Sequence, residues 1–261
     1  MDLGLQNKRA LVLASSQGLG LGIAKTLAAE GAQVILTGRS PELSTLALQL
    51  DATFPGQVLA CPLDLAQPDC VATLSTFVAS QFGQLDILIN NCGGPPVGDI
   101  TSITTEQWLQ QFQMMVLRII EITNTFLPAM RAQKWGRILT VSSISVEQPI
   151  DNLGLSNTLR SALVGWSKTL ANEVAADGIT CNLLLPGRIQ TSRVEQLDQT
   201  RAQQQNRPLE AIQQQALSHI PMHRYGQVEE FAATAAFLVS ELASYITGSK
   251  IRCDGGAIRT V

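Results

Sequence analysis

The chain has 261 residues, of which 45% are hydrophobic and 15% are charged, and its formal net charge at pH 7 is −3. This length suits one α/β domain with a large core, and the charged share lies well below the roughly 25% of typical proteins, which favours extensive buried faces. The mildly acidic balance, without a run of Lys or Arg, argues against a nucleic-acid partner.

Neither a secretion signal nor a membrane span is expected. Lys8 and Arg9 precede an apolar run that is too short for a signal peptide, and no run approaches the roughly 18 apolar residues of a transmembrane helix. The five cysteines are scattered without a C-x-x-C pair, and His219 and His223 are the only histidines. We therefore expect a soluble cytoplasmic protein with reduced thiols and no metal site.

Seven short apolar runs predict strands, at residues 9–14, 32–37, 57–63, 85–90, 136–143, 179–186 and 249–256. Because these runs are apolar on both faces, they are typical of a parallel sheet covered by helices on each side. Segments with helical periodicity separate them. The alternation predicts one doubly wound (Rossmann) α/β domain over 1–261, with a mostly parallel seven-stranded sheet and helices on both faces.

The clearest predicted helix is 154–174, in which apolar residues recur every three or four positions: Leu155, Leu159, Leu163, Trp166, Leu170 and Val174. Apolar residues occupy most of its circumference, so a monomer would leave some of them exposed to water. The short apolar tail that ends the chain at 251–261 suits a second interface. We therefore expect a homotetramer, or at least a dimer.

Residues 196–217 are unusually rich in glutamine. One interpretation is a disordered segment. The other is one or two short helices that form a mobile lid after the sixth strand, and this topology favours it. We place the predicted lid at 192–220.

A glycine-rich turn follows the first predicted strand and opens a helix. Gly18 and Gly20 permit close backbone approach, and the helix from about Leu19 directs its amide donors at a phosphate. A tight turn without a ligand is the alternative, but the position after the first strand of an alternating chain favours a nucleotide site.

The residue after the second strand distinguishes the two nicotinamide cofactors. Where an NAD site carries an acid for the ribose, this chain has Arg39, which suits the 2′-phosphate of NADP. Ser15 and Ser16 offer hydroxyls to the same phosphate. A solvated surface arginine is the alternative, and we expect NADP(H) to bind in preference to NAD(H).

Seven motifs stand in the order of a known family: "ASSQGLG" (14–20), "LDL" (63–65), "NNCGG" (90–94), "SS" (142–143), "LLLPGRIQT" (183–191), "IPMHRYGQVEEFA" (220–232) and "YITGSKIRCDGG" (245–256). Over essentially its whole length the chain resembles the short-chain dehydrogenase/reductase family. The last two motifs are most similar to the branch that contains 3-oxoacyl-carrier-protein reductases.

The resemblance implies further cofactor contacts: Asp64 and Leu65 beside the adenine, Asn91, Cys92 and Gly93 beneath the cofactor, and Pro186, Gly187, Ile189 and Thr191 at the nicotinamide half. Two positions depart from the family pattern. Ala14 replaces the first glycine of the turn, and Cys92 replaces a small alanine.

The catalytic positions depart further. The family's serine, which binds the substrate oxygen, is present as Ser143. Ser156 stands where the family has its proton-donating tyrosine, Arg160 where it has a lysine, and Met115 where it has a water-anchoring asparagine. The pKa of a serine hydroxyl lies far above the phenol value of roughly 10, and arginine remains protonated. Arg160 can still donate hydrogen bonds to ribose hydroxyls.

Ser156 and Arg160 are alternatively ordinary polar helix residues, and three functions remain open. The first is an NADP-dependent oxidoreductase for a carbonyl or hydroxyl substrate, such as a 3-oxoacyl thioester, whose proton donor has moved to water, to the substrate, or to a carboxyl such as Glu147 or Asp151. Glu147 is otherwise a solvated loop acid. The second is a nucleotide-binding sensor or scaffold without turnover. The third is a lyase resembling halohydrin dehalogenase, against which the missing tyrosine and the retained glycine-rich turn both count.

Overall fold

The sheet is built from seven parallel strands in the order β3-β2-β1-β4-β5-β6-β7. The structure is a computed structural model, and it describes residues 1–54 and 58–260. The strands are β1 (Arg9–Val12), β2 (Gln33–Gly38), β3 (Val58–Pro62), β4 (Ile87–Asn90), β5 (Gly136–Val141), β6 (Ile179–Pro186) and β7 (Lys250–Cys253). All seven predicted strands are confirmed, and Gln57, at the start of the third prediction, lies outside the described residues.

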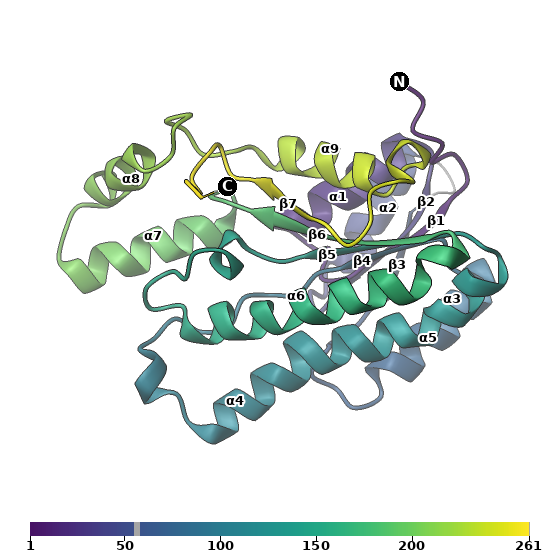
Figure 1. The fold of residues 1–261 in the computed structure, drawn as a ribbon, viewed down its shortest axis with the longest axis horizontal. Coiled ribbons are helices and arrows are strands. Elements are labelled where there is room, and N and C mark those ends of the chain that lie inside the picture. The colour runs from purple at the N-terminus through teal and green to yellow at the C-terminus, as the bar shows by residue number, and fades with distance from the viewer. Residues whose placement is uncertain (55–57, 261) are drawn as a thin grey trace.

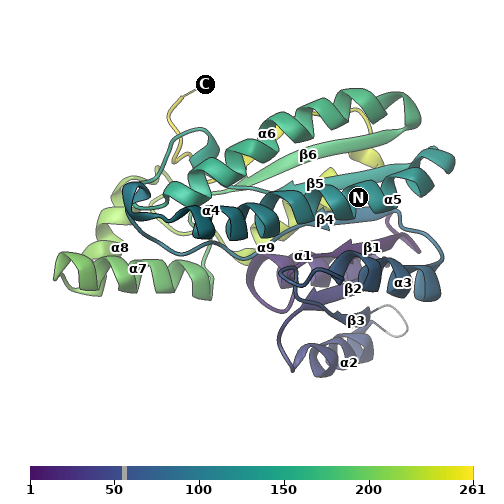
Figure 2. The same ribbon diagram turned by 90° about the horizontal axis from the view of Figure 1, so that it is seen from below.

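Helices cover both faces of the sheet, as predicted (Figures 1 and 2). On one face lie α1 (Gly18–Ala29), α2 (Leu43–Thr53) and α9 (Val228–Leu238). On the other lie α3 (Cys70–Phe82), α4 (Thr105–Phe112), α5 (Arg118–Ala132) and α6 (Gly154–Val174). The strand order reverses at β1, between β2 and β4, and open α/β sheets bind their ligands beside the carboxyl ends of the strands at such a point.

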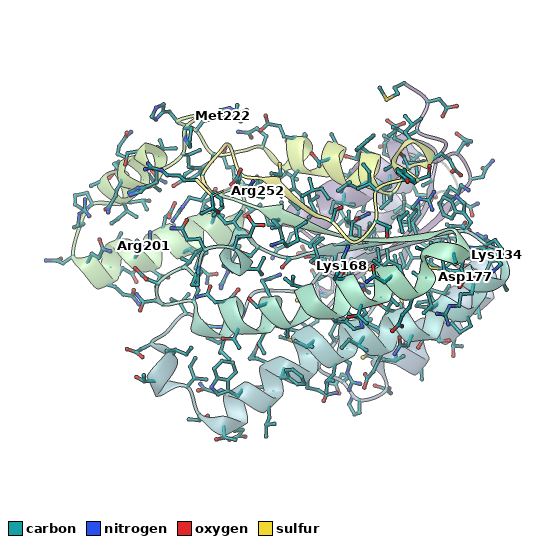
Figure 3. All side chains as sticks on the ribbon, viewed as in Figure 1. Lys134, Lys168, Asp177, Arg201, Met222 and Arg252 are labelled. Atoms are coloured by element: carbon teal, nitrogen blue, oxygen red, sulfur yellow. The ribbon has the colours of Figure 1, made fainter. Side chains whose placement is uncertain are left out.

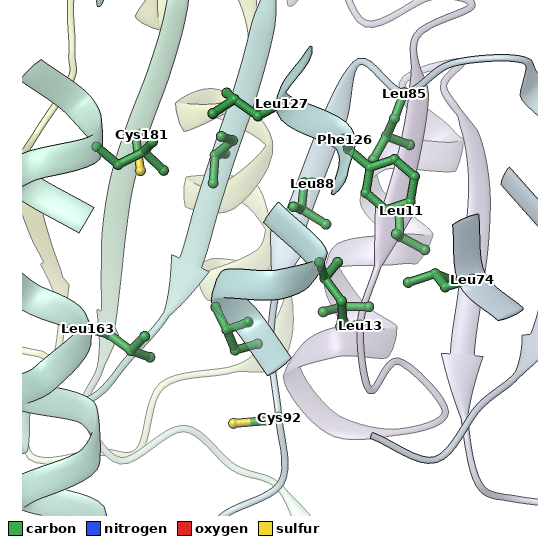
Figure 4. Close-up of a cluster of buried hydrophobic side chains, with 14 of the residues drawn as sticks. Leu11, Leu13, Leu74, Leu85, Leu88, Cys92, Phe126, Leu127, Leu163 and Cys181 are labelled. Carbon is green, nitrogen blue, oxygen red and sulfur yellow. The ribbon is translucent and has the colours of Figure 1, made fainter. Parts of the chain in front are cut away.

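The core between the sheet and the second set of helices is continuous. Leu11 and Leu88 of the strands pack with Leu74, Phe126 and Leu163 of the helices (Figure 4). Burial of one such side chain contributes about 1.5–3 kcal/mol relative to leaving it exposed. The packed sheet therefore provides a rigid base for the loops at its carboxyl edge.

A π-helical turn joins α4 to α5 beside this core. It spans Gln113–Leu117, and α4 begins with a capping box in which Thr104 and Gln107 exchange hydrogen bonds. Met115 lies in this turn and is 1% exposed, packed in the core. Single π turns inside helices are frequent at functional sites. In this chain the turn carries a buried apolar side chain, Met115.

The glutamine-rich segment forms two helices, α7 (Ser192–Gln205) and α8 (Leu209–Ser218). They project beyond the carboxyl edge of the sheet, on the left in Figure 1. Ile212 and Ala216 bury the inner face of α8. The structure thus has helices here rather than a disordered segment, and the lid function of these helices remains a prediction.

Helix α6 has the predicted bounds, but its burial corrects one argument for assembly. Five of its six periodic apolar residues are already buried in the single chain, and Trp166 is partly buried. Small and polar residues, among them Ser161, Ala162 and Gly165, form the exposed face instead. The chain therefore does not need a partner to cover α6. The predicted tail interface ends at Val261, which lies outside the described residues.

No helix in the described part of the chain combines the length and the apolar character that a membrane crossing requires.

Candidate active site

The turn between β1 and α1 is shaped for close approach of a ligand. Ala14 and Gly18 have positive φ angles of 48° and 57°. A Cβ on Gly20 would lie 2.5 Å from the Ala14 carbonyl oxygen, so only glycine fits there. Asn91 Nδ2 donates to that same oxygen at 3.1 Å and ties the end of β4 to the turn.

The first turn of α1 is open to an anion. Gln17 occupies the N-cap position, and its side chain makes no capping hydrogen bond. The first amides of a helix without a side-chain cap are natural donors to phosphate oxygens. Gly18 and Leu19, where the helix begins, are partly exposed. This turn therefore fits a dinucleotide diphosphate.

A second feature lies at the end of β2. Arg39 is exposed, and a cavity of about 380 Å³ next to it is lined by Ser16, Ser40 and residues of α2. A Cβ on Gly38 would lie 3.1 Å from Ser16 Oγ, which places that hydroxyl against the strand end. Ser40 was not predicted from the sequence, although its position directly after Arg39 is a usable signal. Ser16 and Ser40 therefore line a cavity next to the exposed Arg39, a set of donors that suits a phosphate.

Ser15 does not take part in this group, and the prediction for its hydroxyl is wrong. The residue is fully buried. Its Oγ donates to the Val12 carbonyl at 2.8 Å and accepts from the Thr37 amide at 3.0 Å. The hydroxyl joins β1 to β2 inside the protein, because a buried polar group must find internal partners.

The loop after β3 lies next to the end of β2, where the Leu63 amide donates to the Gly38 carbonyl at 2.9 Å. Asp64 accepts from the Ala66 amide at 3.0 Å, and the Leu65 carbonyl accepts from Arg118 Nε at 3.3 Å. Both residues are partly exposed. They stand on the same side as the Arg39 cavity, which is compatible with the predicted adenine contact.

Two neighbouring residues just after β4 differ in burial. Cys92 is 8% exposed and belongs to the core cluster. Burial raises the pKa of the Cys92 thiol, and the nearby Arg160 guanidinium acts in the opposite direction. Gly93 is exposed, and a Cβ added there would meet nothing within 4 Å. The cleft is therefore open above Gly93, as the predicted cofactor path requires.

The end of β6 faces the glycine-rich turn. The Gly187 amide donates to the Cys253 carbonyl at 2.9 Å and fixes the chain after Pro186. Ile189 is buried, and Thr191 caps α7 by accepting from the Val194 amide at 3.4 Å. Thr191 Cγ2 would lie 3.8 Å from a Cβ on Gly18. The two turns therefore lie side by side at the carboxyl edge of the sheet, where the crevice of an open α/β fold binds its ligand.

The three predicted catalytic residues meet at the end of β5. Arg160 Nε donates to Ser156 Oγ at 3.2 Å, and its Nη1 donates to the carbonyls of Val141 and Ser142 at 3.0 and 3.2 Å. Ser143 follows directly, and its Oγ accepts from the Ser145 amide at 3.0 Å. Ser156 and Arg160 are each 9% exposed. They are therefore a buried pair that is held by hydrogen bonds within the protein.

Two further acidic groups, the Tyr225 hydroxyl and the Glu147 carboxylate, make contacts elsewhere in the protein. The Tyr225 hydroxyl donates to Asp198 Oδ2 at 2.8 Å, and Tyr245 is fully exposed. Glu147 forms ion pairs with Lys250 at 3.0 Å and Arg252 at 3.5 Å, so it joins the loop after β5 to β7. It is not the solvated acid that the sequence suggested. Asp151 is exposed.

Comparison with known proteins identifies a matching family. A family profile described as enoyl-(acyl carrier protein) reductase matches residues 13–257. The 3-oxoacyl-[acyl-carrier-protein] reductase of Salmonella typhimurium is 32% identical over 257 residues, which cover 97% of this chain and 98% of the relative.

Two solved structures have the same fold. L-sorbose reductase from Gluconobacter frateurii, complexed with NADPH and L-sorbose, superposes with a TM-score of 0.94 at 33% identity over 100% of both chains. YwfH, an NADPH-dependent reductase involved in bacilysin biosynthesis, superposes with a TM-score of 0.93 at 30% identity over 98% of this chain and 100% of its own. The crevice and the parallel sheet define a dinucleotide-binding α/β protein. The chain belongs to the short-chain dehydrogenase/reductase family.

Proposed function

We propose that the protein is an NADP(H)-binding oxidoreductase that acts on a carbonyl or hydroxyl substrate, such as a 3-oxoacyl thioester, through a non-standard active site. The observation that carries this proposal is the close approach of Thr191 to the β1–α1 turn at the carboxyl edge of the sheet, the edge at which Ser143 follows β5. The similarity to reductases of both thioesters and sugars supports the reaction type.

The group formed by Ser16, Arg39 and Ser40 supports NADP(H) over NAD(H). A guanidinium makes charge-assisted hydrogen bonds to phosphate, and two neighbouring hydroxyls add donors of the right size. The structures of L-sorbose reductase with NADPH and of the NADPH-dependent YwfH favour the same cofactor.

In the proposed chemistry Ser143 binds the substrate, and no tyrosine donates the proton. Bound NADPH supplies a hydride to the substrate carbonyl carbon. Ser143 Oγ accepts from the Ser145 amide, so its own hydrogen is free to donate to the carbonyl oxygen. The Arg160 guanidinium stabilises negative charge as it develops on that oxygen, or holds a ribose hydroxyl. Water then supplies the proton. General acid catalysis contributes about 10²–10⁴-fold, so turnover without the phenol is expected to be slow.

A nucleotide-binding protein without turnover is the second candidate. It is favoured by the bonded state of Ser156, which accepts from Arg160, and by the ion pairs that hold Glu147. Fluorescence titration with NADPH, followed by NADPH oxidation with a panel of carbonyl compounds, separates the two. Micromolar binding with turnover supports the reductase, binding alone supports the second candidate, and no binding contradicts both.

The same proposal assigns α7 and α8 the role of a lid over the crevice within a single domain.

It also includes self-association as a dimer or tetramer, because α6 exposes small residues that permit close packing of helices. Light scattering that gives the 28.0 kDa mass of one chain at micromolar concentration would contradict the assembly.

A further inference from the structure

One cation of α7 reaches back over the crevice. Arg193 Nη2 donates to the Pro95 carbonyl at 2.8 Å, and a Cβ on Gly94 would lie 3.1 Å from the same nitrogen. Its other contact is a long bond of 3.4 Å from Nη1 to Gln196. The guanidinium thus lies on the extension of β4 and is half-buried.

A second cation lies beneath the same extension. Asn90 of β4 is paired with Thr140 of β5, and Cys92 and Ser142 each follow this pair by two residues. Arg160 Nη1 donates to the Ser142 carbonyl, which places this guanidinium next to Cys92, two residues before Gly94. Burial lowers the pKa of Arg193, and the charge of Arg160 lowers it further. The two guanidinium groups therefore lie beside the same short segment after β4, Arg160 next to Cys92 and Arg193 over Gly94.

Neither cation has an acidic partner among the residues that the structure describes. Other arginines of the chain do: Arg118 pairs with Glu121, Arg188 with Asp198, and Arg224 with Glu230. Arg160 Nη2 makes no hydrogen bond within residues 1–54 and 58–260, although the side chain is 9% exposed. Glu147, the acid of the loop after β5, is held by Lys250 and Arg252.

Two neighbouring cations, one buried and one half-buried, are unfavourable without an anion. An anion that enters the crevice offsets this cost, and a guanidinium pairs best with a planar group that accepts two parallel hydrogen bonds. The diphosphate of the cofactor has its own donors at the start of α1, which follows β1, two strands away from the Ser142 carbonyl at the end of β5.

We propose that Arg160 and Arg193 form an anion site for a carboxylate of the substrate, so that the protein acts on oxo acids rather than on neutral carbonyl compounds. This inference rests on the proposed oxidoreductase function, since it names the substrate class of that site. The free Nη2 of Arg160 and the guanidinium of Arg193 hold the carboxylate while Ser143 binds the carbonyl oxygen.

The test uses oxo acids paired with their methyl esters: pyruvate, acetoacetate and levulinate. Binding of each compound to the protein–NADPH complex is followed by NADPH fluorescence, which requires no turnover, and NADPH oxidation is measured beside it. Arg193→Gln removes the proposed charge. Arg201→Gln is the matched control, because Arg201 lies on the same helix at its outer end (Figure 3). Arg193→Lys keeps the charge without the planar group.

The proposal predicts that at least one acid binds wild type tenfold or more tightly than its ester. Arg193→Gln should weaken that acid about 10- to 100-fold, the size of one lost charge-assisted hydrogen bond, and leave the ester within about twofold. Arg193→Lys should recover part of the loss, and Arg201→Gln should change neither ligand.

Equal affinities of acids and esters in wild type would overturn the proposal, and so would an unchanged acid affinity in Arg193→Gln. If Arg193→Gln weakens NADPH itself by tenfold and leaves acid binding to the saturated complex unchanged, the anion is the cofactor diphosphate and the substrate assignment is wrong. Absence of NADPH binding in wild type would contradict the proposed function, and this step is measured before any acid is added.

Discussion

The lid is predicted to depend on one buried carboxylate. Asp198 of α7 is fully buried, and it binds both Arg188, from the loop after β6, and the Tyr225 hydroxyl at 2.8 Å. These contacts connect three segments of the chain at the middle of α7. Asp198→Asn removes the charge and keeps the size of the side chain, so it should release α7 without opening a cavity.

The expected magnitude follows from burial. Breaking a buried ion pair costs about 3–5 kcal/mol, but the Arg188 side chain is 25% exposed and water can solvate it in part. We therefore expect a loss of about 2–3 kcal/mol in the free energy of local opening, which corresponds to roughly 30- to 150-fold faster amide exchange. Tyr225→Phe removes one of the two contacts and should have a smaller effect.

Hydrogen exchange followed by mass spectrometry measures this directly in peptides from α7, α8 and β5. Asp177→Asn is the control, because Asp177 pairs with Lys134 and Arg131 at the opposite end of the molecule (Figure 3). Such exposed pairs contribute little to stability. Acceleration confined to α7 and α8 in Asp198→Asn supports the reasoning. Unchanged exchange in these helices, or equal acceleration in β5, would refute it.

Three further predictions concern the cofactor site and the buried thiols. Arg39→Ala should weaken NADPH at least tenfold and spare NADH, since one charge-assisted contact is worth about 1.5–3 kcal/mol, and equal wild-type affinities for the two cofactors would contradict the assignment. Gly20→Ala should abolish NADPH binding in fluorescence titration, because its Cβ would lie 2.5 Å from the Ala14 carbonyl oxygen; a normal affinity would show that the turn is not the binding element. Burial raises the pKa of the Cys181 thiol to about 11, so between about pH 9 and pH 11 the unfolded chain loses this proton and the folded chain keeps it. The free energy of unfolding should therefore fall as pH rises through this window, by up to about 1.4 kcal/mol per pH unit from this group. Urea unfolding should give a shallower fall for Cys181→Ser, and an identical fall would contradict this account.

The fold could be predicted because its signals are local in the sequence. Strands apolar on both faces, the glycine-rich turn and the helix at 154–174 each follow from a short pattern, and the structure has all of them. Gly18 and Gly20 stand where a nucleotide turn needs them, and the structure supplies the reason in the close approach of the Ala14 carbonyl.

The direction of side chains could not be predicted in the same way. Ser15 and Ser16 are neighbours with the same hydroxyl, but Ser15 joins β1 to β2 and Ser16 lines the cavity beside Arg39. Glu147 meets Lys250 and Arg252 of β7, more than 100 positions away in the sequence. Such contacts depend on tertiary packing, for which a single sequence carries no local pattern.

Two features of the site also could not be predicted from the sequence. Arg193 stands inside a glutamine-rich helix, and its place over Gly94 follows only from the way α7 folds back to the sheet. Met115 occupies the family's asparagine position, and the structure buries it at 1% exposure in the core. An asparagine there would leave an amide in apolar surroundings, so a single substitution does not restore the original site.

The central claim is that this chain transfers hydride from NADPH to a carbonyl held by Ser143, without a phenolic proton donor. The most direct test is transfer of deuterium from 4-deuterated NADPH to a substrate found in the panel, measured by mass spectrometry of the product for wild type and Ser143→Ala. We predict slow deuterium transfer by wild type that falls at least tenfold in Ser143→Ala while the affinity for NADPH stays the same. Rapid transfer that is unaffected by Ser143→Ala would contradict the account, because the chemistry would then lie elsewhere.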